Sequence, residues 1–170
     1  MKKKRTIISF DLDGVLFVNP DKIETEPPLS PFLMHFYPDH LRKGTVQLIR
    51  DLQKENFAIW VYTSSYRTEL YIKALFWHYH IKFDHIINGY RHDKEVQQNK
   101  KNRLPSKLPN YYQISLHIDD EEVVVQNGRD YGFRVLRVNG PDPSWTERIL
   151  QEARLIRDAE NKKNRRPLHR

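Results

Sequence analysis

Short apolar runs alternate along the chain with segments in which apolar residues recur at helical spacing. The apolar runs are typical of buried strands and cover residues 6–11, 57–63, 85–88, 114–119 and 133–138. Helical spacing predicts helices over residues 45–56, 67–79, 121–131 and 143–159, the first with Thr45 as its N-cap. Strands that alternate with helices predict βαβ units. We therefore expect an α/β fold with three layers, in which helices cover both faces of a mainly parallel sheet.

Two segments lack either pattern. Residues 17–40 contain five prolines and are predicted to form a long loop or flap. Residues 91–110 are polar and basic without a clear period. Long ordered loops in compact proteins are often functional, so the flap is a candidate part of a binding site.

The length of 170 residues, of which 38 % are hydrophobic, suits a single domain over residues 1–170. The net charge of +7 is concentrated at the two ends, where we expect basic tails over residues 1–5 and 160–170. Such tails could contact nucleic acid or an anionic surface. Solvated termini explain them equally simply, and this is the interpretation that we prefer.

Two compositional features narrow the class of protein. The absence of cysteine excludes disulfides and thiolate chemistry. No apolar run approaches the length of a membrane span, and Asp11 and Asp13 interrupt the first apolar stretch, which makes it a poor secretory signal. We therefore expect a soluble, cytoplasmic protein without a membrane partner.

Three of the predicted strands end in polar side chains. They are Asp11 with Asp13, Thr63 with Ser64, and Asp119 with Asp120. In a parallel sheet the carboxyl ends of the strands lie at one edge, where ligands bind. Burying a carboxylate without a partner is costly, so a cation or a hydrogen-bond network is expected there.

The stretches "DLDGVL", "WVYTSS" and "HIDDEE", together with Lys107, resemble the four motifs of the haloacid dehalogenase-like (HAD) hydrolases. The resemblance covers about residues 6–140. It implies a Rossmann-like domain. The gaps between Asp13, Thr63 and Lys107 are too short for a large cap domain, so we expect the capless type.

The resemblance also implies roles for individual residues. Asp11 would be the nucleophile that forms an aspartyl-phosphate, and Asp13 would act as general acid and then as general base. Thr63 and Ser64 would bind phosphoryl oxygens. Lys107 would neutralise charge on the nucleophile and on the transferring group.

Magnesium is the expected cofactor, because a divalent cation screens the repulsion between a phosphate ester and a carboxylate nucleophile. Oxygen ligands suit Mg²⁺, and the predicted set is Asp11, Asp13 through its backbone carbonyl, Asp119 and Asp120. Alternatively, Asp11 and Asp13 could be turn residues before Gly14, and the pair at 119–120 could only cap a helix.

The lysine is the least specific of the four motifs. Lys94, Lys100 and Lys101 lie in the same polar stretch as Lys107 and could fill its role. The histidines at 78, 80, 85 and 92 are interpreted as surface or packing residues rather than metal ligands.

The expected activity is the magnesium-dependent hydrolysis of a phosphomonoester, with a phosphorylated small molecule or macromolecule as substrate. The presence of Asp13 favours phosphoryl transfer, because family members that act on carbon–halogen bonds usually lack this acid. Two alternatives remain: a HAD-like binding or regulatory domain with weak or no turnover, and a phosphatase that processes nucleic-acid ends. No recognised nucleic-acid-binding motif supports the last.

Overall fold

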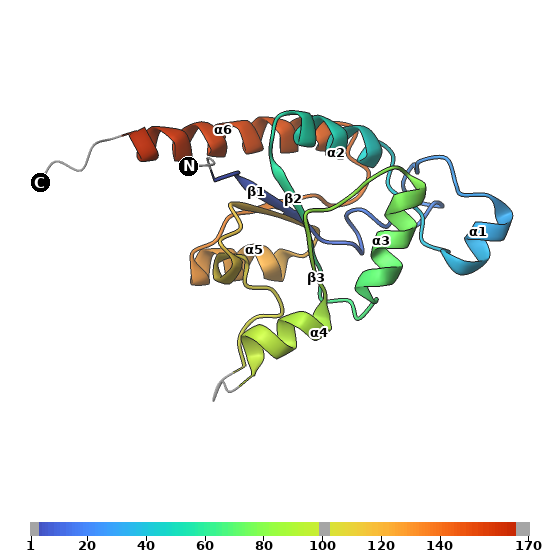
Figure 1. The fold of residues 1–170 in the computed structure, drawn as a ribbon, viewed down its shortest axis with the longest axis horizontal. Helices are drawn as coiled ribbons and strands as arrows, with labels where there is room; N and C mark the ends of the chain where they lie inside the picture. Colours follow the sequence, from blue (N-terminus) through green and yellow to red (C-terminus); the bar gives the residue numbers. More distant parts are fainter. Residues whose placement is uncertain (1–3, 99–102, 166–170) are drawn as a thin grey trace, which may run out of the picture.

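A five-stranded parallel sheet forms the centre of the computed structural model, which describes residues 4–98 and 103–165 (Figure 1). The strands are β1 (Ile7–Phe10), β2 (Ala58–Tyr62), β3 (His85–Ile87), β4 (Leu116–Asp119) and β5 (Val135–Arg137). Their order across the sheet is β3-β2-β1-β4-β5, and every neighbouring pair is parallel. The predicted α/β fold with a central parallel sheet is therefore confirmed.

Helices connect the strands. They are α1 (Pro31–Phe36), α2 (Thr45–Lys54), α3 (Glu69–His78), α4 (Gly89–His92), α5 (Glu122–Tyr131) and α6 (Trp145–Arg165), with a π-helical turn at Asp93–Gln97 and a 3₁₀ turn at Pro109–Tyr112. The π-helical turn and the start of the 3₁₀ turn lie in residues 91–110, the segment for which the sequence showed no period. None of the helices in the described residues is both long and apolar enough to cross a membrane.

Two predicted boundaries were wrong. Helix α6 continues to Arg165, whereas residues 160–170 were expected to form a tail. Its apolar stripe includes the buried Ile156, and Glu160 accepts a hydrogen bond from the Thr6 hydroxyl at 2.6 Å, so contacts with the body carry the helix further. The N-cap of α2 is Gly44 at φ +89°, not Thr45, which is the first helical residue. Residues 1–3 and 166–170 of the expected tails lie outside the described residues.

The two faces of the sheet differ because strand side chains alternate between them. Ile8 and Phe10 of β1 belong to the main hydrophobic core, to which α2, α3 and α6 contribute. In Figure 1, α2 and α6 lie together on one side of the sheet, and α5 lies on the other. The opposite face carries a smaller apolar cluster and also holds buried polar side chains, among them Ser9 and His117. These polar groups lie beneath the candidate site.

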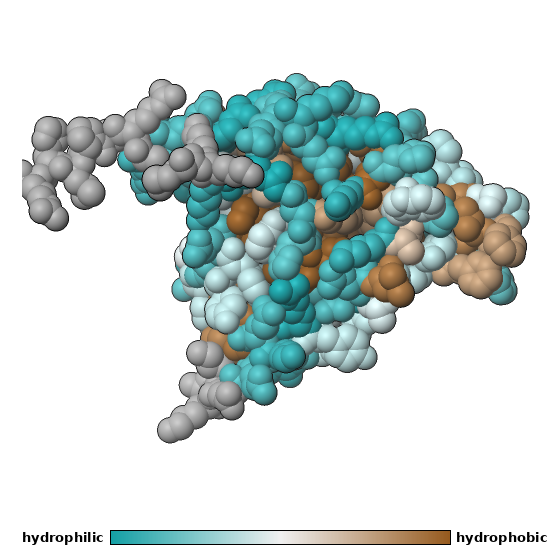
Figure 2. Space-filling model, viewed as in Figure 1, coloured by the Kyte–Doolittle hydropathy of each residue, from teal (hydrophilic) through white to brown (hydrophobic). Residues whose placement is uncertain are grey.

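The segment between β1 and β2 contains α1 and α2 but no cap domain. Isolated bridges join Phe17 to Leu41 and Thr25 to Arg42, so the proline-rich flap is tied at its base. The short helix α1 at its tip exposes Phe32 and Phe36, and Figure 2 shows hydrophobic residues gathered over this projection.

Candidate active site

The predicted site residues from three different strands meet at the carboxyl edge of the sheet. Strand β1 pairs with β2 on one side and with β4 on the other. The amide of Asp11 donates to the carbonyl oxygen of Ile118 at 2.9 Å, which continues the β1–β4 ladder to the site. Thr63 directly follows β2, and its amide donates to Ile87 at 2.9 Å. The parallel pairing therefore places the ends of β1, β2 and β4 side by side.

Lys107 joins the aspartates at the ends of β1 and β4. Its Nζ lies 2.6 Å from Oδ2 of Asp11 and 2.6 Å from Oδ2 of Asp119. The three side chains are 1 %, 7 % and 0 % exposed, respectively, so one buried cation faces two buried carboxylates. Burial raises the pKa of Asp11, against the effect of the lysine. Burial alone would lower the pKa of Lys107, but the two carboxylates raise it.

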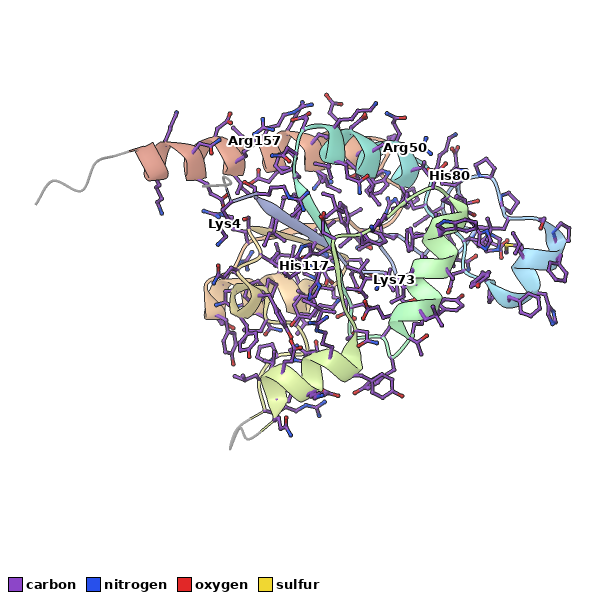
Figure 3. All side chains as sticks on the ribbon, viewed as in Figure 1. Lys4, Arg50, Lys73, His80, His117 and Arg157 are labelled. Atoms are coloured by element: carbon purple, nitrogen blue, oxygen red, sulfur yellow. The ribbon has the colours of Figure 1, made fainter. Side chains whose placement is uncertain are left out.

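His117 supports Asp119 from beneath. His117, which is labelled in Figure 3, lies at the centre of the molecule. Its Nε2 lies 2.9 Å from Oδ2 of Asp119, and its Nδ1 lies 2.8 Å from the hydroxyl of Ser9. Burial would raise the pKa of Asp119, but its contacts with His117 and Lys107 lower that pKa to about 2. The Asp119 carboxylate is therefore ionised at neutral pH and held in one orientation.

Asp120 completes a group of three carboxylates. One oxygen from each of Asp11, Asp119 and Asp120 lies within 4.8 Å of the others. Oδ1 of Asp120 is buried and has no hydrogen-bond partner among residues 4–98 and 103–165. Burial and the charges of the other two aspartates raise the pKa of Asp120. Clustered carboxylate oxygens, one of them lacking a partner, fit a hard divalent cation such as Mg²⁺.

Gly14 gives Asp120 its space in this cluster. It adopts φ +77°, a left-handed conformation that favours glycine, and a Cβ there would lie 2.2 Å from Oδ2 of Asp120. The glycine of the "DLDG" stretch thus serves both the turn after β1 and the close approach of the Asp120 carboxylate.

The other predicted site residues differ in their exposure. Thr63 is buried, and its hydroxyl accepts a hydrogen bond from the amide of Ser65 at 3.1 Å. Ser64 is exposed. The Asp13 carboxylate is 57 % exposed and pairs with Arg67 at 2.8 Å, so it lies outside the group of three carboxylates. The predicted metal contact through the Asp13 backbone carbonyl stays a prediction.

Comparison with known proteins identifies the fold. A HAD-superfamily hydrolase of subfamily IA, variant 1, from Geobacter sulfurreducens superposes with a TM-score of 0.54 at 14 % identity, over 87 % of this chain and 100 % of that one. The protein has the HAD-like fold.

Other solved structures share this architecture. An uncharacterized protein from Listeria monocytogenes serotype 4b matches with a TM-score of 0.50 at 16 % identity, over 86 % of this chain and 97 % of that one. A chain of the Pnkp1/Rnl/Hen1 complex also matches with a TM-score of 0.50, at 14 % identity, over 83 % of this chain and 48 % of its own length. No protein-family model and no curated protein matches the sequence.

Within this fold, buried hydrogen bonds hold the loop that carries Lys107 in place. The Tyr62 hydroxyl accepts a hydrogen bond from the amide of Leu108 at 2.7 Å and lies 2.6 Å from Nδ1 of His92. His92 is buried. Lys94 is exposed, whereas Lys100 and Lys101 lie outside the described residues. Among the lysines that the structure describes, Lys107 is the one bonded to the aspartates.

Two cavities border the flap of this fold. One of about 240 Å³ lies beside the site and is lined by Asp13, Phe17, Val18, Asn19, Pro38, Asp39 and His40. A larger one of about 530 Å³ lies between the flap and the starts of α2 and α6, and includes none of the predicted site residues. Of these two cavities, only the smaller one therefore borders a predicted site residue, Asp13.

Three polar residues near the site were not predicted from the sequence: His117, Arg67 and Asp39. His117 could have been found, because it lies two positions before Asp119 in a strand and so shares its face. Arg67 and Asp39 carry no such signal. Their contact joins residues 28 positions apart through an irregular loop, which no periodicity predicts.

Proposed function

We propose that this protein is a magnesium-dependent phosphomonoesterase with Asp11 as its nucleophile. The single observation that carries the proposal is the placement of Lys107 between Asp11 and Asp119, next to the unpartnered oxygen of Asp120. A buried cation beside a carboxylate, with a further cluster of oxygen ligands, suits a reaction in which negative charge accumulates. The HAD-superfamily hydrolase with the same fold supports this proposal.

In the first step, an oxygen of the Asp11 carboxylate attacks phosphorus, and the bond to the leaving oxygen breaks. Asp13 gives its proton to that leaving oxygen, so an alcohol departs and an aspartyl-phosphate remains on Asp11. Lys107 offsets the charge on Asp11 and on the transferred group. The Thr63 hydroxyl and the Ser64 amide bind phosphoryl oxygens.

In the second step, the Asp13 carboxylate takes a proton from water as the water oxygen attacks the phosphorus of the aspartyl-phosphate. The bond between phosphorus and Asp11 breaks, which releases inorganic phosphate and restores both carboxyl groups to their starting forms. One exposed acid thus serves both steps, consistent with the exposure of its carboxylate.

Asp11, Asp119 and Asp120 would hold Mg²⁺, with the backbone carbonyl of Asp13 as a further ligand. The bound ion would screen the repulsion between these carboxylates and the phosphate dianion. Because Lys107 already bridges Asp11 and Asp119 through their Oδ2 atoms, the lysine holds the site together before substrate binds.

The test is the release of p-nitrophenol from p-nitrophenyl phosphate with Mg²⁺ and with excess chelator. We expect the wild type to turn over only with Mg²⁺, and Asp11→Asn to be inactive while its circular dichroism is unchanged. A wild type without turnover, on this substrate and on a panel of sugar phosphates, nucleotides, phosphopeptides and phosphorylated nucleic-acid ends, would favour a binding domain instead. Selective turnover of nucleic-acid ends would favour the end-processing alternative.

A further inference from the structure

Arg67 forms ion pairs with two carboxylates that come from different parts of the chain. Its Nη1 donates to Oδ2 of Asp13 at 2.8 Å and to the hydroxyl of Ser65 at 2.9 Å. Its Nε and Nη2 donate to the two oxygens of Asp39 at 3.1 and 3.0 Å. Asp39 also accepts a hydrogen bond from the hydroxyl of Tyr71 at 2.8 Å. The guanidinium thus links the loop after β1, the flap and α3.

Arg67 itself is well anchored. Its carbonyl oxygen accepts a hydrogen bond from the Asn88 side chain at 2.9 Å, and its guanidinium lies 5.2 Å from the centre of the Phe17 ring. Its side chain is 28 % exposed. A guanidinium fixed at two points by one carboxylate presents its remaining N–H groups in a defined direction.

Asp13, in contrast, depends on Arg67. Its carboxylate is 57 % exposed, and its hydrogen bond to Arg67 is the only one that its side chain makes within the described residues. Its Oδ1 is thus left without a protein partner in that part of the chain. Without Arg67 the carboxylate would rotate in solvent, because an exposed side chain gains rotamer entropy when it is released. The contact therefore sets where Asp13 points.

We propose that Arg67 is the positioning residue for Asp13. Because Arg67 also binds Asp39 of the flap, the orientation of the Asp13 carboxylate depends on the position of the flap. The inference rests on the proposed phosphatase function. Arg67 holds Oδ2 of Asp13 and leaves Oδ1 to exchange the proton with the leaving oxygen and then with water. Loss of Arg67 should slow each step that needs Asp13 and spare a step that does not.

The leaving group separates these steps. The unprotonated leaving group of benzyl phosphate is an alkoxide, which is a poor leaving group. Cleavage of benzyl phosphate therefore needs a general acid in the correct position. p-Nitrophenolate is a stable anion, so formation of the aspartyl-phosphate from p-nitrophenyl phosphate hardly needs one. The ratio kcat/KM reports the steps up to formation of the phosphoenzyme. A comparison of the two esters therefore measures how well Asp13 is placed as an acid.

The experiment measures kcat/KM for both esters with Mg²⁺ in the wild type, Arg67→Met and Asp13→Asn. For Arg67→Met we expect kcat/KM on benzyl phosphate to fall at least about tenfold, as for a general acid that is misplaced but present. On p-nitrophenyl phosphate it should fall less than about threefold, by the same reasoning. Asp13→Asn should show the same selectivity with a larger fall. Adding Arg67→Met to Asp13→Asn should then have no further effect on benzyl phosphate, because both changes act through one group.

Further variants guard against misfolding. Arg67→Lys keeps the positive charge but cannot bind Asp39 through two N–H groups. Asp39→Asn keeps Arg67 but weakens the contact that holds it. In each variant kcat/KM should fall less than in Arg67→Met, and the fall should again be larger on benzyl phosphate. Arg154→Met is the control, because Arg154 pairs with Glu55, the C-cap of α2, which lies before the amino end of β2 and so away from the carboxyl ends of the strands. It should leave both substrates unchanged.

Equal falls on both esters would overturn the inference, because they would indicate a structural or phosphate-binding role for Arg67. No fall on either ester would overturn it too. In both cases, turnover by the wild type and its loss in Asp11→Asn would leave the proposed function intact. A wild type without phosphatase activity would refute the function and this inference together.

Discussion

Lys107 Nζ lies 2.6 Å from Oδ2 of Asp11, although 96 positions separate the two residues in the sequence. Both side chains are buried, and Asp119 binds the same Nζ. The cluster places one positive charge between two negative ones. Such a buried pair adds little net stability by itself, but removal of one partner leaves charge without compensation.

Lys107→Met should therefore destabilise the fold by about 3–5 kcal/mol at pH 7, as expected when one partner of a buried ion pair is removed. The measurement is the free energy of unfolding from urea titrations. Lys94→Met is the matched control, because Lys94 is exposed; it should change stability by less than about 0.5 kcal/mol. An equal effect of the two substitutions would contradict the central place of Lys107.

The loss of stability caused by Lys107→Met should become smaller at low pH. Burial already raises the pKa of Asp11 in the wild type, and removal of the positive charge of Lys107 raises this pKa further. A group with a raised pKa in the folded state loses stability as pH rises through that pKa, so the variant recovers below about pH 4. In the wild type, the pKa of Asp119 is lowered, so its effect on stability runs in the opposite direction: the stabilisation by the ionised Asp119 is lost as pH falls toward 2. The stability difference between the two proteins should therefore narrow on acidification.

Gly14→Ala should disturb both the backbone and the Asp120 carboxylate. The change places a side chain at φ +77° and a Cβ 2.2 Å from Oδ2 of Asp120. Gly132→Ala separates the two effects, because Gly132 has φ +75° but no atom within 4 Å of the added Cβ. We expect about 1 kcal/mol of destabilisation for Gly132→Ala from backbone strain alone, and more for Gly14→Ala. Equal losses would show that Asp120 does not occupy this space.

Mg²⁺ should stabilise the folded protein in a concentration-dependent way, because it binds an arrangement that the unfolded chain lacks. The expected gain is about 1–3 kcal/mol at saturating ion, followed as a rise in Tm. Asp120→Asn should remove most of this gain, because the carboxylate has an oxygen without a hydrogen-bond partner in the described part of the chain. Glu121→Gln removes a neighbouring exposed charge and should retain the gain. A gain that survives Asp120→Asn would contradict the assignment of this carboxylate to the ion.

Much of the edge of the sheet could be predicted from the sequence. The apolar runs before Asp11, Thr63 and Asp119 predicted parallel strands, and parallel strands bring their carboxyl ends together. Lys107 could be chosen among the lysines only through the family resemblance. Its position depends on Tyr62, whose hydroxyl accepts a hydrogen bond from the neighbouring amide of Leu108 and is itself in contact with His92.

The contacts around Asp13 and the end of the chain could not be predicted in the same way. Arg67 and Asp39 lie in loops, where side-chain direction follows from tertiary packing rather than from a repeating pattern. The extension of α6 to Arg165 depends on contacts such as the bond between Thr6 and Glu160, 154 positions apart. Basic composition alone suggested a tail there.

The most direct test of the central claim is to trap the phosphorylated enzyme. The wild type is mixed with p-nitrophenyl phosphate and Mg²⁺, quenched in acid within the first turnovers, and analysed by peptide mass spectrometry. The account predicts an added phosphoryl group on Asp11 that hydroxylamine removes, as expected for an acyl phosphate, and its absence from Asp11→Asn. A phosphoryl group on another residue, or rapid turnover with no phosphorylated peptide at any quench time, would contradict Asp11 as the nucleophile.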